Sequence, residues 1–244
     1  MKTLLCLLTF ILVLSTDMTA QDRVLDIKVM EGQRYDHLIP DDMKYILPEF
    51  QECRFFSRYG EEFTGLINPN FLTDNIYLLT STGDTLRIAG SEDIVRITAP
   101  DRTVLQRDNK FMTVIAEHRN TALCECPCVD IDFFHEVNEA DEALTALEDR
   151  ISLNTGSYKI IINDPSYNNN HPADSARFVT VRCTYSIQHF LVIGDKAYPC
   201  RLSSFTKAFP ERKKAIKDFT KLYYTDFSNR ESLIMLFEYC TVQL

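Results

Sequence analysis

The chain between residues 53 and 133 alternates short β-prone runs with turn residues. The runs are rich in β-branched, aromatic and leucine side chains, and glycine, proline, asparagine and aspartate stand between them. This pattern predicts strands at residues 55–58, 63–67, 76–79, 85–88, 94–98, 103–106 and 111–116. Because the connections are short, we expect an antiparallel β-meander, either a barrel-like sheet or a curled open one.

The segment from 136 to 200 is expected to add a helix, a loop and further strands. Residues 129–149 hold eight acids and no lysine or arginine, and Val137, Ala140, Leu144 and Leu147 recur there at helical spacing. A solvated acidic face is favoured over a calcium site, since the D-x-D-x-D-G loop pattern is missing. A strand near 158–162, a polar loop at 163–172, strands at 178–187 and 190–193, and a hairpin strand at 197–199 are predicted to follow.

After residue 200 the apolar residues recur at helical spacing. Ser203 is a candidate N-cap, Pro210 suits the start of a second helix, and Ser228 and Glu231 have capping-box spacing. The predicted buried positions are Ala215, Ile216, Phe219 and Tyr223 in the second helix and Leu233, Ile234, Leu236, Phe237 and Cys240 in the third. The fold class is therefore α+β: an antiparallel β-meander or barrel-like sheet, a further hairpin and a C-terminal helical tail.

The first twenty residues have the pattern of a secretory signal peptide. Lys2 precedes an apolar run over residues 4–14, and cleavage is expected between Ala20 and Gln21. No segment reaches the roughly 20 apolar residues of a membrane-spanning helix, so no membrane span is expected. We therefore expect an exported protein (periplasmic, outer-membrane-associated or secreted) divided into a signal peptide (1–20), a β-rich domain (21–135), a middle segment (136–200) and the helical tail (201–244).

The charge balance limits the classes of partner. A net charge of −9 argues against a general polyanion binder, and nucleic acid is not an expected partner. The second tail helix is locally basic, with Lys207, Arg212, Lys213, Lys214, Lys217 and Lys221 in or beside it. A solvated face is the favoured interpretation, and a partner site with the acidic segment 129–149 as counterpart is the other.

Three cysteines stand at alternate positions in the stretch TALCECPCVD, namely Cys124, Cys126 and Cys128. On a strand these side chains share one face. The opposite face is the more apolar, so the thiols are expected to lie outward or at a sheet edge. Pro127 also indicates an edge strand or a bulge, because proline cannot donate to a central ladder.

Three chemistries remain open for this triplet. Cα atoms two residues apart on a strand are about 6.6 Å from each other, so disulfides to Cys53, Cys183 or Cys200 are favoured over pairing within the triplet. A second possibility is a Zn²⁺ or Cu(I) site in which His135 or Asp130 joins Cys124, Cys126 and Cys128, although the C-x-x-C spacing is absent. The third is thiol exchange by the Cys-Glu-Cys pair. The mature chain would hold seven cysteines, which leaves one unpaired.

Two blocks of the chain resemble a family of uncharacterised secreted proteins of Bacteroidota-type bacteria. The blocks cover roughly residues 45–106 and 188–240, and the matching motifs are YILPEF, LINPN, DNIY, GDTL and DI in the first and SFTKAFPERKK, DF and LI in the second. The triple cysteine departs from the family pattern. The resemblance concerns strand, turn and cap positions, so no catalytic residue can be carried over from it.

The sequence favours a non-enzymatic protein. The G-x-S-x-G, H-E-x-x-H and phosphate-loop motifs are absent, and His37, His118, His171 and His189 are scattered along the chain. The leading hypothesis is an exported binding or envelope-associated interaction protein of unknown ligand, with an envelope protein as one partner class and no cofactor. The alternative is a metal-binding or thiol-redox protein that uses Cys124, Cys126 and Cys128.

Overall fold

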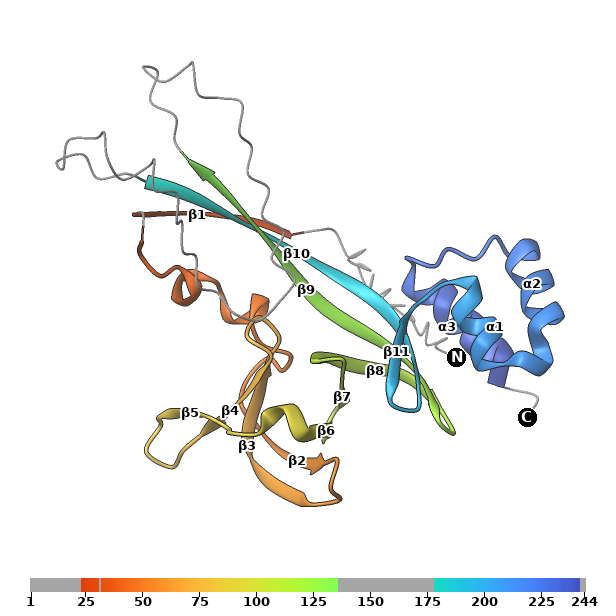
Figure 1. The fold of residues 1–244 in the computed structure, drawn as a ribbon, viewed down its shortest axis with the longest axis horizontal. Helices are drawn as coiled ribbons and strands as arrows, with labels where there is room; N and C mark the ends of the chain where they lie inside the picture. The colour runs from red at the N-terminus through yellow and green to blue at the C-terminus, as the bar shows by residue number, and fades with distance from the viewer. Residues whose placement is uncertain (1–22, 31, 136–177, 242–244) are drawn as a thin grey trace, which may run out of the picture.

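The computed structural model describes residues 23–30, 32–135 and 178–241 (Figure 1). The predicted signal peptide, the acidic helix around 137–147, the strand at 158–162 and the loop at 163–172 lie outside these residues. Within the described residues, no helix is long and apolar enough to cross a membrane.

The described strands form one antiparallel sheet of eleven strands, with β1 and β5 at the two ends of the pairing order. The order is β1-β10-β9-β8-β7-β6-β2-β3-β4-β5, and β11 pairs with β10. The strands are β1 (Arg23–Met30), β2 (Gln51–Ser57), β3 (Glu62–Asn70), β4 (Asn75–Leu79), β5 (Thr85–Arg87), β6 (Ile94–Thr98), β7 (Thr103–Arg107), β8 (Lys110–His118), β9 (Thr121–His135), β10 (Phe178–Ile193) and β11 (Lys196–Pro199). The seven predicted strands of the meander are confirmed as β2 to β8. The sheet is open and not a barrel, because β1 and β5 do not pair with each other.

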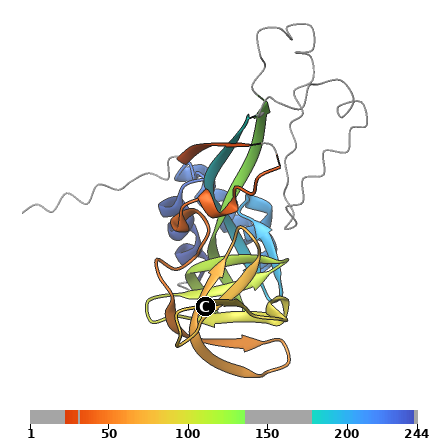
Figure 2. The same cartoon turned by 90° about the vertical axis from the view of Figure 1, so that its left-hand side faces the viewer.

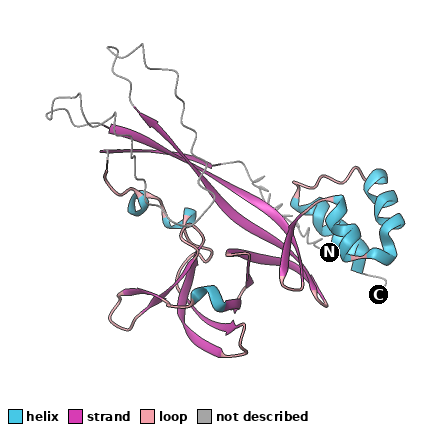
Figure 3. Ribbon diagram, in the orientation of Figure 1, coloured by secondary structure: helices cyan, strands magenta, loops and turns pink. Residues whose placement is uncertain are grey.

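β9 and β10 form a ladder much longer than the other pairings and cross the molecule as a twisted ribbon (Figures 1 and 3). It runs without a break from Thr121 opposite Ile193 to His135 opposite Val179. The two strands predicted at 178–187 and 190–193 are therefore one strand, since Gln188 and His189 continue the pairing. β1 and β11 share the other edge of β10.

The sheet builds several apolar clusters instead of one core. Strands β2 to β7 enclose one of them, with Ile67, Ile76 and Val104 fully buried. At one end of the β9–β10 ladder, two 3-10 helices, η1 (Asp36–Leu38) and η2 (Asp41–Met43), belong to a segment that covers Ile131 and Val181. Figure 2 shows this segment beside the ribbon and above the meander.

The C-terminal helical unit covers the other end of the same ladder. It consists of α1 (Leu202–Ala208), η5 (Pro210–Arg212), α2 (Lys213–Leu222) and α3 (Arg230–Thr241). Its buried side chains pack on Leu123 and Leu191 and include Phe205, Ile216, Leu233, Leu236, Phe237 and Cys240. The predicted helical tail and the buried side of its third helix are confirmed.

The helix starts differ from the sequence prediction by one or two residues. α1 begins at Leu202, so Ser203 lies inside the helix and does not cap it. The N-cap of α3 is Asn229, whose Oδ1 accepts a hydrogen bond from the Ser232 backbone N–H at 2.9 Å. Ser228 instead donates its hydroxyl to Asp226 Oδ1 at 2.7 Å, within the turn that precedes α3.

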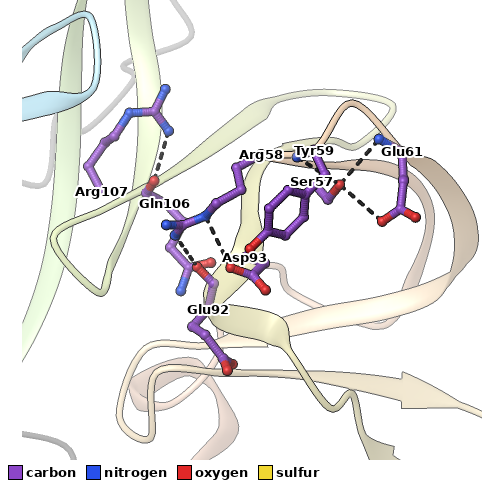
Figure 4. Close-up of polar contacts among 8 residues, drawn as sticks. All are labelled: Ser57, Arg58, Tyr59, Glu61, Glu92, Asp93, Gln106 and Arg107. Atoms are coloured by element: carbon purple, nitrogen blue, oxygen red, sulfur yellow. Dashed lines mark hydrogen bonds and ion pairs between the residues drawn. The ribbon is translucent and has the colours of Figure 1, made fainter.

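A polar network ties the β2–β3 turn to the 3-10 helix η3 (Ser91–Asp93) (Figure 4). Ser57 Oγ accepts the backbone N–H groups of Tyr59 and Glu61, both at 3.2 Å. The Arg58 guanidinium donates to the Glu92 carbonyl at 2.9 Å and pairs with Asp93 Oδ1 at 3.1 Å. Since these bonds satisfy turn and helix-end groups, we assign the network a structural role.

Candidate functional site

The three cysteines of β9 lie at the boundary of a buried region. The side chains of Cys124 and Cys126 are 0% and 2% exposed, and Cys128 is half-buried. The expectation that the thiols lie outward is therefore wrong for Cys124 and Cys126. They join Met112 and Phe190 in an apolar cluster that spans β7 to β10. Cysteine behaves as a small hydrophobic residue, so counting it as polar led to the wrong face.

Pro127 lies where β9 loses one of its two neighbours. The ladder between β8 and β9 ends at Glu125, and from Cys126 onward β9 pairs only with β10. The edge position predicted from Pro127 is confirmed for this part of the strand. One side of the backbone around Cys128 is consequently free of a partner strand among the described residues.

The four other described cysteines lie in three other clusters, away from the triplet. Cys53 packs inside the meander, Cys183 packs under the N-terminal segment, and Cys200 and Cys240 lie beneath the helical unit. All seven described cysteines are free thiols. The expected pairing of the triplet with Cys53, Cys183 or Cys200 is not present in the structure.

The predicted metal ligands Cys124, Cys126, Cys128 and His135 all lie on β9. Among the described residues, no group of three or more histidine, cysteine, aspartate or glutamate side chains is placed to hold a metal ion. His135 lies seven residues beyond Cys128 on β9, about 23 Å along an extended strand. The backbone therefore does not bring His135 to Cys128, and the side chain of His135 lies outside the described part.

Cys126 and Cys128 differ from the other thiols in their electrostatic surroundings. Both thiols donate to backbone carbonyls, Cys126 to Pro127 at 3.8 Å and Cys128 to Cys126 at 3.7 Å. The interaction between the two neighbouring thiols lowers the pKa of Cys128 and raises that of Cys126. The Lys110 ammonium lowers the pKa of Cys128 further. By contrast, burial raises the pKa to about 12 for Cys124 and Cys200, and to about 11 for Cys183.

Asp74 is a second unusual group near this thiol pair. It lies in the β3–β4 turn with φ of 51°, a left-handed conformation that aspartate and asparagine adopt more readily than most residues. Burial raises the pKa of its carboxyl to about 6, and Lys110 opposes the shift. Asp74 and Lys110 come from positions 16 residues or more before Cys126, so strand periodicity could not reveal them.

On the opposite face of β9, Glu125 connects the sheet to the helical unit. Arg230 Nε donates to Glu125 Oε1 at 2.8 Å, and His189 Nε2 lies 3.7 Å from the same oxygen. The contact with His189 and then the charge of Arg230 lower the pKa of Glu125. The His189 side chain is 7% exposed, and we interpret this trio as an anchor for α3.

The outer side of α2 carries the main exposed basic surface of the helical unit. We define the lysine face as Lys213, Lys214, Lys217 and Lys221, all of which are exposed. At its C-terminal end stand three large exposed side chains, Leu222, Tyr223 and Tyr224, with exposed fractions of 69%, 56% and 90%. The predicted burial of Tyr223 is therefore wrong, because α2 ends at Leu222 and Tyr223 lies beyond it.

The lysine face belongs to the one basic section of an acidic chain. Residues 201–244 carry eight Lys or Arg against five Asp or Glu, a net charge of +3. The preceding 200 residues carry 18 against 30, a net charge of −12. The sequence already showed the basic second tail helix, but the exposed aromatic and leucine side chains at its C-terminal end were not predicted.

Comparisons with protein-family models, with curated proteins and with solved structures give no match for this chain. The resemblance to uncharacterised secreted Bacteroidota proteins stays a prediction.

Proposed function

We propose that this chain is an exported, non-enzymatic interaction protein of the cell envelope, which docks through its helical unit on anionic lipid headgroups. The lysine face, next to Leu222, Tyr223 and Tyr224 on an otherwise acidic protein, carries this proposal. Tyrosine and lysine are common at membrane interfaces, where an apolar body and a polar tip both find a suitable environment.

The expected binding is reversible and oriented. Each lysine near an anionic surface contributes about 1 kcal/mol, so four contribute about 4 kcal/mol, which corresponds to a dissociation constant of about 1 mM. Burial of Leu222 and the two tyrosines adds to this at about 25 cal/mol per Å² of apolar area. The acidic sheet would be repelled by the same surface, so the helical unit should face the lipid.

Vesicle flotation of the mature protein, residues 21–244, tests the proposal. We expect flotation with vesicles of phosphatidylglycerol and phosphatidylethanolamine, and none with phosphatidylcholine alone. The double variant Lys213→Gln/Lys217→Gln should bind at least about tenfold more weakly, because it removes two surface charges worth about 1 kcal/mol each. A charge-matched control, Arg87→Gln/Lys196→Gln, changes two exposed basic residues of the sheet and should bind like the wild type. Equal binding by both variants, or no binding at all, contradicts the proposal.

The alternative function is a metal-binding or thiol-redox protein. The part of the chain that the structure describes offers an observation in favour of thiol chemistry and none in favour of metal binding. The observation is that buried Cys126 and half-buried Cys128 share one face of β9 just beyond the end of the β8 ladder. It does not depend on the lysine face and is developed next.

A further inference from the structure

We propose that Cys126 and Cys128 form a thiol-exchange site, in which Cys128 attacks an incoming disulfide and Cys126 resolves the mixed disulfide. The site lies on β9 just beyond the end of the β8 ladder, with Lys110 at the start of β8 and Asp74 in the β3–β4 turn nearby. It is independent of the lipid-binding face.

The first argument is access. An exchange site needs one sulfur that a second molecule can reach, and a second sulfur within reach of the first. Among Cys53, Cys124, Cys126, Cys128, Cys183, Cys200 and Cys240, only Cys128 is not fully buried. Its neighbour Cys126 is 2% exposed, so an incoming disulfide meets Cys128 and not Cys126.

The second argument is the ionisation of the two sulfurs. The thiolate is the nucleophile, and hydrogen bonds or positive charges that favour it make a cysteine reactive. The neighbouring Cys126 and then the Lys110 ammonium lower the pKa of Cys128, and they outweigh burial, Asp130 and Asp74, which raise it. Cys128 is therefore the thiol of the pair that ionises first. The pKa of Cys126 is raised and its thiol donates to the Pro127 carbonyl at 3.8 Å, so Cys126 keeps its proton while Cys128 attacks.

The third argument is the backbone. Cα atoms two apart on a strand are about 6.6 Å from each other, close to the upper limit for a disulfide. A bond between Cys126 and Cys128 is therefore strained, and strained disulfides are readily reduced. β9 no longer pairs with β8 at this point, and Pro127 has no backbone N–H that a movement could deprive of a hydrogen bond. The backbone between Cys126 and Cys128 can therefore shift on its unpaired side. These features suit a bond that forms and breaks more than a permanent crosslink.

The reaction balances as a transfer of two electrons from the dithiol to a disulfide. The Cys128 thiolate attacks one sulfur of R–S–S–R, a bond forms from Cys128 to that sulfur, and one RS⁻ leaves. Cys126 then loses its proton and attacks the Cys128 sulfur, which releases the second RS⁻. That proton and the proton that Cys128 released on ionising protonate the two departing thiolates. The protein is oxidised to the Cys126–Cys128 disulfide, and the substrate disulfide is reduced to two thiols.

Reaction of the reduced mature protein with oxidised glutathione tests this assignment. After acid quenching, intact mass and peptide mapping should show loss of two hydrogens and a link between Cys126 and Cys128. The Cys126→Ser variant should stop at one glutathionyl group on Cys128, and Cys128→Ser should acquire neither product. Cys183→Ser, which alters a buried thiol of another cluster, is the matched control and should react as the wild type does.

A measurement on the unmutated protein keeps the test decisive if a variant fails to fold. Limited alkylation with iodoacetamide, followed by peptide mapping, should modify Cys128 before the other six cysteines. Its rate should persist below pH 8.5, about the ordinary thiol pKa. Equal labelling of all cysteines, preferential labelling of any other cysteine, or glutathione adducts on Cys126 with Cys128 unmodified would overturn the proposal.

Discussion

The two ends of the β9–β10 ladder are built from the same two strands but differ in what covers them. At the covered end, around Leu123 and Leu191, helices pack on one face and the β7–β8 strands extend the apolar cluster of the other. At the open end, the η1–η2 segment covers one face, while Phe134 and Phe178 on the other are 45% and 38% exposed.

The three cysteines of β9 lie on a single face, in a row that leads from the covered end toward the open end: Cys124, Cys126 and Cys128. Their spacing is regular, yet their surroundings change from full burial to partial exposure within five residues. Chemistry at this triplet is therefore set by where the cover ends and not by the spacing of the thiols.

The largest expected contrast is between aromatic side chains of the two ends. Phe205 is 0% exposed in the helical cluster, so Phe205→Ala should lower the free energy of unfolding by about 3–5 kcal/mol, through lost burial and an unfilled cavity. Phe134→Ala removes the same group from the open end, where it stacks against Arg182, and should change stability by no more than about 1 kcal/mol. Urea denaturation monitored by circular dichroism measures both variants. Similar losses for both would show that the open end is as tightly packed as the covered one.

The strands of the meander and the helical tail were predictable because their signals are local. Turn residues bracket each β-prone run, and the buried positions of α3 repeat at helical spacing. The pattern allowed either a barrel-like sheet or an open one, and the structure has the open sheet. Which strands meet across a sheet is decided by non-local pairing, which a pattern of short runs does not contain.

The surroundings of the thiols were not predictable for the same reason. The cover on Cys124 and Cys126 comes from β7, β8 and β10. Of the charges near Cys128, only Asp130 is local in sequence, while Lys110 and Asp74 come from other strands and turns. The single long strand β10 was missed because polar Gln188 and His189 interrupt its apolar run, although β9 continues to pair with them. The cysteine spacing located the right stretch of chain, and only the tertiary structure separates Cys128 from its two neighbours.

The pH dependence of stability measures how strongly the Asp74 carboxyl, near Cys126 and Cys128, is buried. The folded pKa of Asp74 is about 6, above the roughly 3.9 of an unfolded aspartate. Between these values the folded state holds a proton that the unfolded state releases, so the free energy of unfolding falls as pH rises from about 4 to 6. Asp74→Asn keeps the left-handed turn and removes this loss. It should stabilise the protein by about 1–2 kcal/mol at pH 7, allowing for partial solvent screening, and by little at pH 4.

The matched control for this profile is Asp108→Asn. Asp108 has the same φ of 51° but is exposed, so its substitution measures the effect of an aspartate-to-asparagine change in this backbone conformation at the surface. If the change in the free energy of unfolding caused by Asp74→Asn did not depend on pH, the Asp74 carboxyl would be solvated. The buried region of β9 would then end closer to Cys124.

The smallest expected contrast concerns the arginines that pair across each end. Arg230→Ala removes the 2.8 Å contact with Glu125 that joins α3 to β9, and should lower the free energy of unfolding by about 1 kcal/mol at pH 7. The folded pKa of Glu125 is lowered, so this stabilisation is present above the unfolded pKa of about 4.3 and disappears as pH falls through the folded value. The two urea curves, wild type and Arg230→Ala, should therefore converge in acid. Arg182→Ala breaks the 2.8 Å pair with Asp26 at the open end, where both partners are well exposed, and should have the weaker effect. A larger effect of Arg182→Ala would mean that the pair between β1 and β10, and not the anchor of α3, is the stronger electrostatic link in the ladder.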